Sequence, residues 1–334
     1  MNKVISRIPD VRNELFGFSI ISIMIFHFCE DTEKANPSAV LSALVWGYNL
    51  LLGSVGVEIF LFLSGMGLFY SLSRDARITR FYRKRLARIL PTYLLFGGAG
   101  WLALDILIRN AGWTRFGLDF SMLSFWAEGV RLVWYIALIL ALYLLFPLLY
   151  RLINTSDAFA VVLIAAVFAG CLTLYFCAPA VYDNIEIALW RVAVFLVGIW
   201  YGKRRNQGKG FAKEWLVFAV LGAVFMLLNL LTNHYPSLLG GVFSLRLGLL
   251  FYPMIVIFVA AAVLLRLKDG KIRRVLRFFG AMSLELYLSH VMLRAVMNAL
   301  GLSTAFLPYY LLCLTASFLL SLAAHKLLST RRSK

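Results

Sequence analysis

Four ionisable side chains interrupt long apolar stretches of this chain: His27, Glu58, Arg191 and His290. A charge at the centre of a helix in lipid costs about 2.5–3.5 kcal/mol on insertion scales, so each of these residues calls for a functional explanation. Histidine exchanges a proton near neutral pH. His27 is therefore the candidate general base, and Glu58 is the candidate carboxylate that orients its ring and stabilises its cation.

Two further acidic residues, Glu30 and Asp31, follow His27 closely in the sequence. Either could take the place of Glu58 beside the imidazole. Because they lie near the outer end of the same apolar stretch, we expect them to be solvated loop residues.

A basic run, Arg83–Arg88, ends shortly before Pro91. Arg85 and Arg88 are three residues apart and therefore share one face of a helix. Guanidinium groups match phosphate oxygens in shape and charge, so the pair could bind a phosphorylated ligand. Basic residues at a cytoplasmic helix end also satisfy the positive-inside rule alone, and the spacing does not decide between the two interpretations.

Ser64 lies in a segment rich in small residues, Gly53–Gly67. Small residues let neighbouring helices approach closely. Ser64 and Gly65 could also leave space for a slender ligand arm, and both interpretations stay open.

The elements that carry these residues are predicted to be transmembrane helices. Of the 334 residues, 62% are apolar and only 15% are charged, whereas about 25% are charged in soluble domains. The apolar residues form runs of about 18–23, each long enough to cross a hydrocarbon layer of ~30 Å as a helix. Ten spans are predicted, at 15–32, 50–72, 90–108, 130–150, 158–178, 185–202, 214–232, 243–265, 278–297 and 305–327. We therefore predict an all-α polytopic bundle that forms one membrane-embedded domain over residues 1–334.

The positive charges support this count of spans. The net charge is +17, but Lys and Arg cluster in short segments between apolar runs, which argues against a nucleic-acid partner. With the N-terminus inside, the predicted cytoplasmic segments hold 26 Lys and Arg residues and the outer segments hold 4. The positive-inside rule then predicts that both termini are cytoplasmic. On this topology the four intramembrane ionisable residues lie about 17–21 Å from the cytoplasmic helix ends, a shared depth that one polar cavity would explain.

The sequence contains no metal-binding pattern. Its four cysteines are scattered, no zinc-type histidine pair occurs, and we expect no metal. The first apolar run lacks a small-residue cleavage site, so we expect an uncleaved first helix.

Five segments together resemble the acyltransferase-3 family of membrane acyltransferases. They are FGFSIISIMIFHF (16–28), GVEIFLFLSG (56–65), FYRKRLARILPTYLL (81–95), VWYIALILALYLLFPLL (133–149) and SLELYLSHVML (283–293). The resemblance implies a ten-helix fold in a bacterial plasma membrane. It also implies acyl-CoA, usually acetyl-CoA, as the cytoplasmic donor and an extracytoplasmic carbohydrate as the acceptor.

The resemblance also implies roles for particular residues. His27 matches the intramembrane histidine of the family, Arg85 and Arg88 match its RxxR motif, and Ser64 matches its SG element.

One position departs from the family pattern, because Phe16 stands where the family has an arginine in the first helix. Arg12 lies one turn earlier on nearly the same face, so a long side chain there could replace the missing one. Arg12 therefore joins the donor-binding candidates, and Arg191 and His290 are candidates for the substrate site.

The predicted function is acyl transfer across the membrane. Arg12, Arg85 and Arg88 would hold the phosphates of acyl-CoA, whose pantetheine arm is comparable in length to the depth of His27. His27 would act as general base on the acceptor hydroxyl or carry the acyl group transiently. Some relatives have an extracytoplasmic transferase domain, and we expect none here, so the bundle transfers directly or a separate extracytoplasmic protein completes the transfer.

Two other functions stay open. A transporter or flippase for a glycan or lipid-linked sugar would also need buried ionisable groups. A non-catalytic membrane sensor of the same fold is the other alternative, and Phe16 at the usual arginine position favours it.

Overall fold

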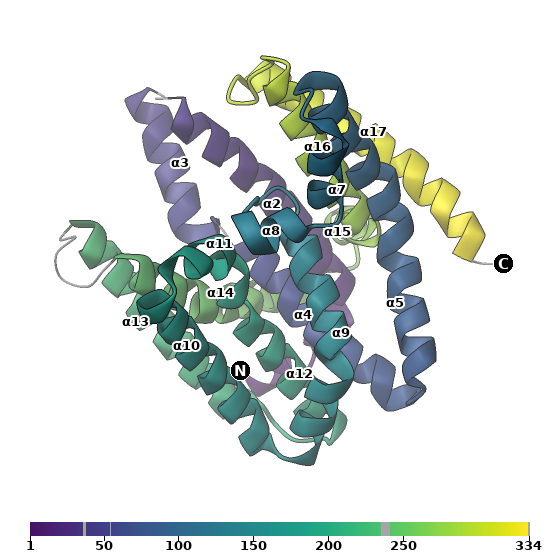
Figure 1. Ribbon diagram of the computed structural model, residues 1–334. Coiled ribbons are helices and arrows are strands. Elements are labelled where there is room, and N and C mark those ends of the chain that lie inside the picture. Colours follow the sequence, from purple (N-terminus) through teal and green to yellow (C-terminus); the bar gives the residue numbers. More distant parts are fainter. Residues whose placement is uncertain (36–37, 54, 235–240, 333–334) are drawn as a thin grey trace.

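The structure, a computed structural model, describes residues 1–35, 38–53, 55–234 and 241–332, and this part of the chain is a helical bundle without β-strands (Figure 1). Its α-helices are α1 (Asn2–Ile5), α2 (Arg12–Lys34), α3 (Ala39–Leu52), α4 (Val55–Arg74), α5 (Ile78–Thr92), α6 (Ala99–Trp101), α7 (Gly112–Phe120), α8 (Leu123–Glu128), α9 (Trp134–Thr155), α10 (Asp157–Cys177), α11 (Pro179–Leu189), α12 (Val192–Asn206), α13 (Ala212–His234), α14 (Gly241–Arg266), α15 (Lys271–Ala281), α16 (Ser283–Ala299) and α17 (Leu307–Arg332). A 3-10 helix, η1 (Ile8–Val11), precedes α2, and two π-helical stretches, η2 (Tyr93–Gly98) and η3 (Leu102–Ile108), flank α6. The prediction of an all-α fold is confirmed.

Seven helical segments in the described part of the chain are long and apolar enough to cross a membrane. They are Ile8–Lys34, Ala39–Arg74, Ile78–Ile108, Trp134–Thr155, Asp157–Cys177, Pro179–Asn206 and Leu307–Leu328. The other three predicted spans coincide with α13, α14 and α16. Helix α16 has only 17 residues and includes Glu285, His290 and Arg294, which lower its hydropathy. The loop predicted between 232 and 243 lies partly outside the described residues.

Several segments predicted as connections are helical instead. Residues 33–49 contain most of α3, 109–129 contain α7 and α8, and 266–277 contain most of α15. The predicted span 185–202 is also interrupted, because α11 ends at Leu189 and α12 begins at Val192. These helices were missed because the predicted boundaries followed charge and run length rather than the 3.6-residue period.

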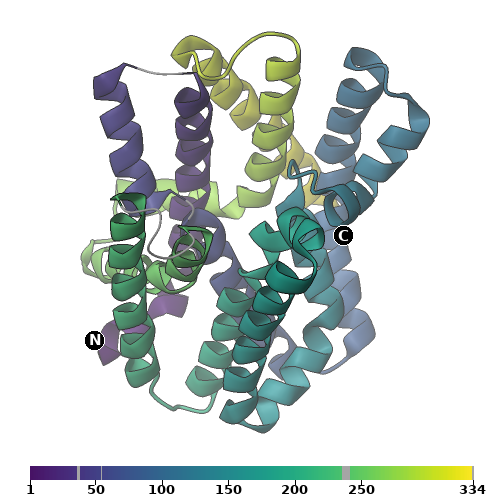
Figure 2. The ribbon, with the colours of Figure 1, turned by 60° about the vertical axis from the view of Figure 1, so that its left-hand side comes forward.

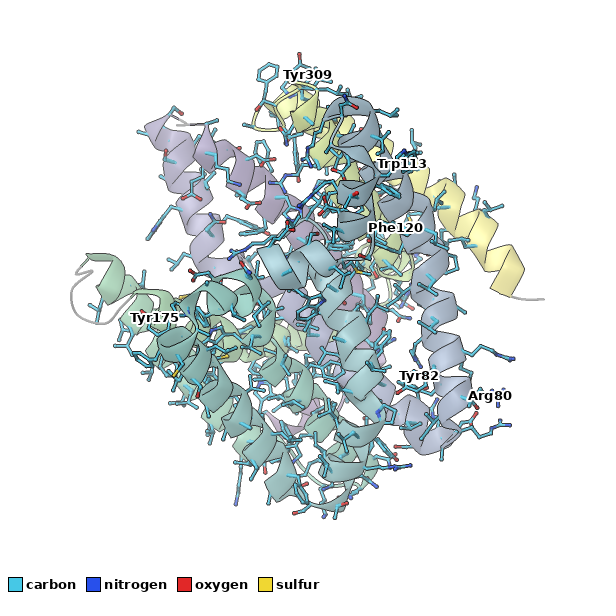
Figure 3. All side chains as sticks on the ribbon, viewed as in Figure 1. Arg80, Tyr82, Trp113, Phe120, Tyr175 and Tyr309 are labelled. Atoms are coloured by element: carbon cyan, nitrogen blue, oxygen red, sulfur yellow. The ribbon has the colours of Figure 1, made fainter. Side chains whose placement is uncertain are left out.

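Several helix connections lie at two opposite ends of the bundle (Figures 1 and 2). The turns from α9 to α10 and from α12 to α13 lie at the lower end in both views, whereas α2 ends and α16 joins α17 at the upper end. Figure 3 labels Arg80 and Tyr82 towards the lower end and Trp113 and Tyr309 at the upper end. Exposed aromatic side chains at one end are typical of a membrane–water interface.

Helices α4 and α12 approach so closely that their backbones touch. A Cβ atom built on Gly65 would clash with the carbonyl oxygen of Phe195, and one on Gly198 would clash with that of Phe62. Gly17 and Gly280 bring α2 and α15 together in the same way. Gly65 therefore serves helix packing, the first of the two interpretations of the small-residue segment.

Replacing Gly65 by alanine is expected to destabilise the bundle by about 1–3 kcal/mol, because α4 and α12 must separate. The matched control is Gly170→Ala in α10, where a new Cβ has nothing within 4 Å. That change is expected to be neutral or slightly stabilising. Thermal unfolding of the purified variants in one detergent measures both, and equal stability of the two variants would contradict the packing account.

Candidate active site

Two of the cavities in the described part of the chain are lined by the predicted site residues. The basic cavity has a volume of about 360 Å³, and its lining includes Arg12, Ser64, Arg85, Arg88, Tyr135 and Tyr143. The histidine cavity has a volume of about 580 Å³, and its lining includes Phe26, His27, Lys34, Arg131, Trp134 and Arg191. The structure thus separates the phosphate-binding candidates from the candidate base.

Arg12 reaches the basic cavity from the first turn of α2. Its guanidinium carbon lies 4.6 Å from the centroid of the Phe16 ring, a cation–π contact. Gly67 of α4 leaves the necessary room, because a Cβ there would lie 2.9 Å from Nη2 of Arg12. Phe16 therefore supports a cation at the cavity, although it is not one itself.

Arg85 and Arg88 reach the same cavity from α5. Nη2 of Arg85 donates to Oγ of Ser71 at 2.7 Å, and Nη2 of Arg88 donates to the carbonyl oxygen of Ala281 at 3.3 Å. Nη2 of Arg88 also lies 4.0 Å from the fully buried carboxylate of Glu285. The structure therefore gathers all the predicted donor-binding residues, Ser64 included, around one cavity.

Two arginines that line the basic cavity have an unpaired guanidinium donor. Nε of Arg12 and Nε of Arg85 are buried and have no hydrogen-bond partner among the described residues. A buried donor without a partner costs free energy, more so when it is charged. A phosphate oxygen in this cavity would satisfy such donors, which fits a phosphorylated ligand.

His27 is held against a second histidine. The rings of His27 and His290 are stacked, with their centroids 5.3 Å apart and an angle of 15° between the planes. His290 is fully buried behind His27; its Nε2 lies 3.3 Å from the hydroxyl of Tyr310, and its Nδ1 lies 3.9 Å from Sγ of Cys313. His290 thus supports the His27 ring from behind, and it is His27 that lines the cavity.

Glu58 pairs with Arg191. Nε of Arg191 donates to Oε1 of Glu58 at 2.7 Å, and Nη1 donates to the carbonyl oxygen of Ile187 at 2.5 Å. The guanidinium carbon lies 4.9 Å from the ring centroid of Trp134. Nδ1 of His27 has no hydrogen-bond partner among the described residues. The role of Glu58 in orienting His27 thus stays a prediction, whereas its ion pair with Arg191, at the break between α11 and α12, is observed.

The expectation that Glu30 and Asp31 lie in a solvated loop was wrong, because both belong to α2 and pair with Arg294. Asp31 is only 9% exposed and lies within α2, where its carboxylate accepts hydrogen bonds from Arg294 and Thr304. Asp31 follows His27 by four residues, so the helical period could have placed both on one face. The partner, Arg294, could not be inferred, because it comes from α16.

The cations of the histidine cavity are matched by carboxylates. The pairs are Lys34 with Glu30, Arg131 with Glu186, Arg191 with Glu58, and Arg294 with Glu30 and Asp31. Four cations and four carboxylates leave no net charge. Counted in the same way, the three arginines that line the basic cavity have one carboxylate, that of Glu285 near Arg88, so this cavity keeps a net positive charge. The two cavities therefore differ in charge as well as in position.

The model of the acyltransferase-3 family, described as an acyltransferase domain, matches residues 17–326. The chain belongs to this family. The match includes His27 and the RxxR arginines, and it extends from the first to the last of the seven helical segments of the described part of the chain that are long and apolar enough to cross a membrane.

A curated relative agrees with this assignment. Acyltransferase MdmB of Streptomyces mycarofaciens is 26% identical over 160 residues, which cover 44% of this chain and 40% of that protein. The chain thus matches less than half of the length of that relative. No solved structure matches this acyltransferase-3 protein.

Proposed function

We propose that this protein transfers an acyl group, acetyl in the first instance, from cytoplasmic acyl-CoA to a hydroxyl of an extracytoplasmic carbohydrate in the bacterial plasma membrane. The observation that carries the proposal is the pair of cavities. A net positive cavity suits the phosphates of coenzyme A, and a neutral cavity holds the candidate base. A membrane acyltransferase whose donor and acceptor lie on opposite sides needs two such cavities.

The basic cavity provides the donor site in this proposal. Arg12, Arg85 and Arg88 bind the phosphates, and Ser64 of α4 lies beside the path of the pantetheine arm. Guanidinium groups bind phosphate through charge-assisted hydrogen bonds, which are the strong ones. Phe16 then does not mark a lost function, because Arg12 supplies the cation.

Replacing Arg12, Arg85 or Arg88 singly by glutamine is expected to raise the KM for acyl-CoA about ten-fold or more, because each loses about 1.5–3 kcal/mol of charged hydrogen bonding. The matched control is Arg83→Gln, on the same helix but exposed and outside the lining of the cavity. Arg83→Gln should leave KM within about two-fold, the range of ordinary surface changes. The measurement is the rate of CoA release against acyl-CoA concentration, and equal effects of Arg83 and Arg85 would remove the donor site from this cavity.

The proposed reaction requires one base, which takes the proton of the acceptor hydroxyl and later returns it to the leaving group. His27 takes the proton of the acceptor hydroxyl as its oxygen attacks the thioester carbonyl. A carbon–oxygen bond forms, the carbon–sulfur bond breaks, and the proton passes from His27 to the departing thiolate. In the alternative route the acyl group resides transiently on the His27 imidazole before it reaches the acceptor.

The histidine cavity favours an uncharged carbohydrate as the acceptor. Its cations are already paired, so an anionic acceptor would have to displace Glu30 or Glu186 from an arginine or lysine. Trp134 and Phe26 add apolar surface to a charged lining. Such a mixture suits a sugar, which has apolar ring faces and hydroxyl edges.

One observation favours a transporter instead. The interruption at Arg191 divides one membrane segment into α11 and α12, and discontinuous helices are common at substrate sites of transporters. A transporter would move its substrate unmodified and without acyl-CoA.

The acyl-ester content of cell-surface glycans separates these functions. It is measured in cells with the wild-type protein, with His27→Ala and without the protein. The proposal predicts ester above background in the wild type alone. Equal ester content in all three strains, together with movement of an unmodified glycan that depends on this protein, would favour the transporter.

A further inference from the structure

Tyr287 of α16 is the one side chain in the described part of the chain that lines both cavities. It is only 3% exposed, and its ring lies edge-on to that of Tyr135, with the centroids 5.3 Å apart and an angle of 71° between the planes. Tyr135 lines the basic cavity but not the histidine cavity. The two cavities thus adjoin at a wall made by an aromatic pair.

The wall lies one helical turn from His290, the residue that stacks on the candidate base. Tyr287 precedes His290 by three residues on α16, so both face the same side of that helix. His290 in turn stacks on His27. His27 lines only the histidine cavity, whereas the three arginines line only the basic cavity. A thioester held by the arginines therefore has to pass Tyr287 before it reaches His27.

A membrane protein with a cavity towards each end needs such a wall. The histidine cavity extends to Lys34, the last residue of α2, at the upper end of the bundle. The basic cavity is lined by the basic helix α5 and by α15. Without a barrier the two cavities would join into one polar path through the bundle. Water in that path would also reach the thioester from the acceptor side.

We propose that the Tyr287 ring, packed on Tyr135, is the barrier that separates the donor and acceptor cavities and keeps acceptor-side water from the thioester. The separation of the cavities is independent of the reaction, while the protection of the thioester rests on the proposed function. In unprotected hydrolysis water adds to the carbonyl carbon, the carbon–sulfur bond breaks, and a carboxylic acid and the CoA thiol form. The ring, and not its hydroxyl, supplies the barrier.

The barrier can be tested without the reaction. The four cysteines are replaced by alanine, and Ser64→Cys places a thiol in the basic cavity. A membrane-impermeant, negatively charged thiosulfonate is then added to intact cells or to inside-out vesicles. With Tyr287 present, labelling is expected from the cytoplasmic face only. With Tyr287→Ala, and with Tyr287→Leu as a second variant, labelling from the outer face should rise at least ten-fold, while Tyr287→Phe should behave as the wild type.

Two controls make the outcome decisive. A single symmetric peak in size-exclusion chromatography shows that each purified variant is folded, and labelling from the cytoplasmic face shows that its thiol is reactive. Tyr143→Ala removes a phenol that lines only the basic cavity and should leave the outer face closed. The barrier would be contradicted if the wild type, Tyr287→Ala and Tyr287→Leu were labelled equally from the outer face. Labelling of Tyr143→Ala from the outer face would also contradict it.

The chemical consequence is measured separately. In the folded Tyr287→Ala protein, acyl-CoA hydrolysis without acceptor should increase relative to acyl transfer by about ten-fold. If the ratio of hydrolysis to transfer is unchanged although Ser64→Cys is labelled from the outer face, Tyr287 separates the cavities but does not protect the thioester. A wild type that neither transfers nor hydrolyses would defeat the proposed function, and the labelling result would still decide the barrier.

Discussion

Replacing His27 by alanine is expected to lower acyl transfer by about 10²–10⁴-fold, the range of general acid–base catalysis. The loss should appear in kcat rather than in the KM for acyl-CoA, because His27 does not line the basic cavity. The bundle should remain folded after this change. Nδ1 of His27 has no hydrogen-bond partner among the described residues, so the substitution leaves no such partner unpaired. Initial rates of CoA release by purified protein in lipid nanodiscs, with an acceptor glycoside present, measure the effect.

His325→Ala is the matched control for this experiment. His325 lies on α17, is partly exposed and belongs to the lining of neither cavity. Its replacement should change the rate by no more than about two-fold, the range of ordinary surface changes. Equal losses in the two variants would mean that a general effect of removing a histidine, rather than catalysis, is being measured. Full activity of His27→Ala would end its assignment as base or acyl carrier.

Replacing Arg191 by leucine is expected to cost about 3–5 kcal/mol of stability, because it removes the cation from a buried carboxylate. Glu58 is fully buried and Arg191 is 6% exposed, so the pair lies away from bulk water. The change also removes the hydrogen bond to Ile187 at the end of α11 and the contact with Trp134. Denaturation of the purified protein in mixed micelles measures the loss.

The double variant Glu58→Leu/Arg191→Leu separates the ion pair from packing. An apolar pair of similar size often replaces a buried ion pair without loss, so the double variant should recover most of the stability. Arg77→Ala, at the exposed pair with Asp75, is the surface control and should cost less than about 1 kcal/mol. A double variant as unstable as Arg191→Leu alone would show that Arg191 acts through packing rather than through Glu58.

The sequence predicted the depth of the four ionisable residues in the bundle, but not which of them contact each other. Apolar run lengths placed His27, Glu58, Arg191 and His290 at one depth, and the structure brings His27 to His290 and Glu58 to Arg191. Depth follows from helix rise alone. The choice of partner depends on how each helix is rotated about its axis, which the spacing of one helix does not determine.

The helical period was informative where two residues share one helix. Arg12 and Phe16 are one turn apart, and the structure stacks one on the other. Asp31 has the same relation to His27, but its position near the end of an apolar run led to its assignment to a loop. Helices α3 and α15 were not predicted for a related reason. The charge pattern indicates on which side of the membrane a connection lies, but not whether that connection contains a short helix.

Tyr287 shows a further limit of sequence patterns. It occurs within the segment that resembles the acyltransferase-3 family, yet nothing in its type or spacing separates it from the other apolar and aromatic residues there. Its position between two cavities depends on eight helices from distant parts of the chain. Such a role becomes visible only once the cavities are known.

The central claim is transfer of an acyl group between the two faces of the membrane, and proteoliposomes test it most directly. Radiolabelled acetyl-CoA is sealed inside, and an uncharged glycoside is supplied only outside. Neither compound crosses lipid unaided, so only protein with its basic cavity facing the lumen contributes. The account predicts ester-linked label on the external glycoside with the wild type and none with His27→Ala. Label that stays in the lumen with the wild type, or glycoside that enters the vesicles unmodified, would contradict it.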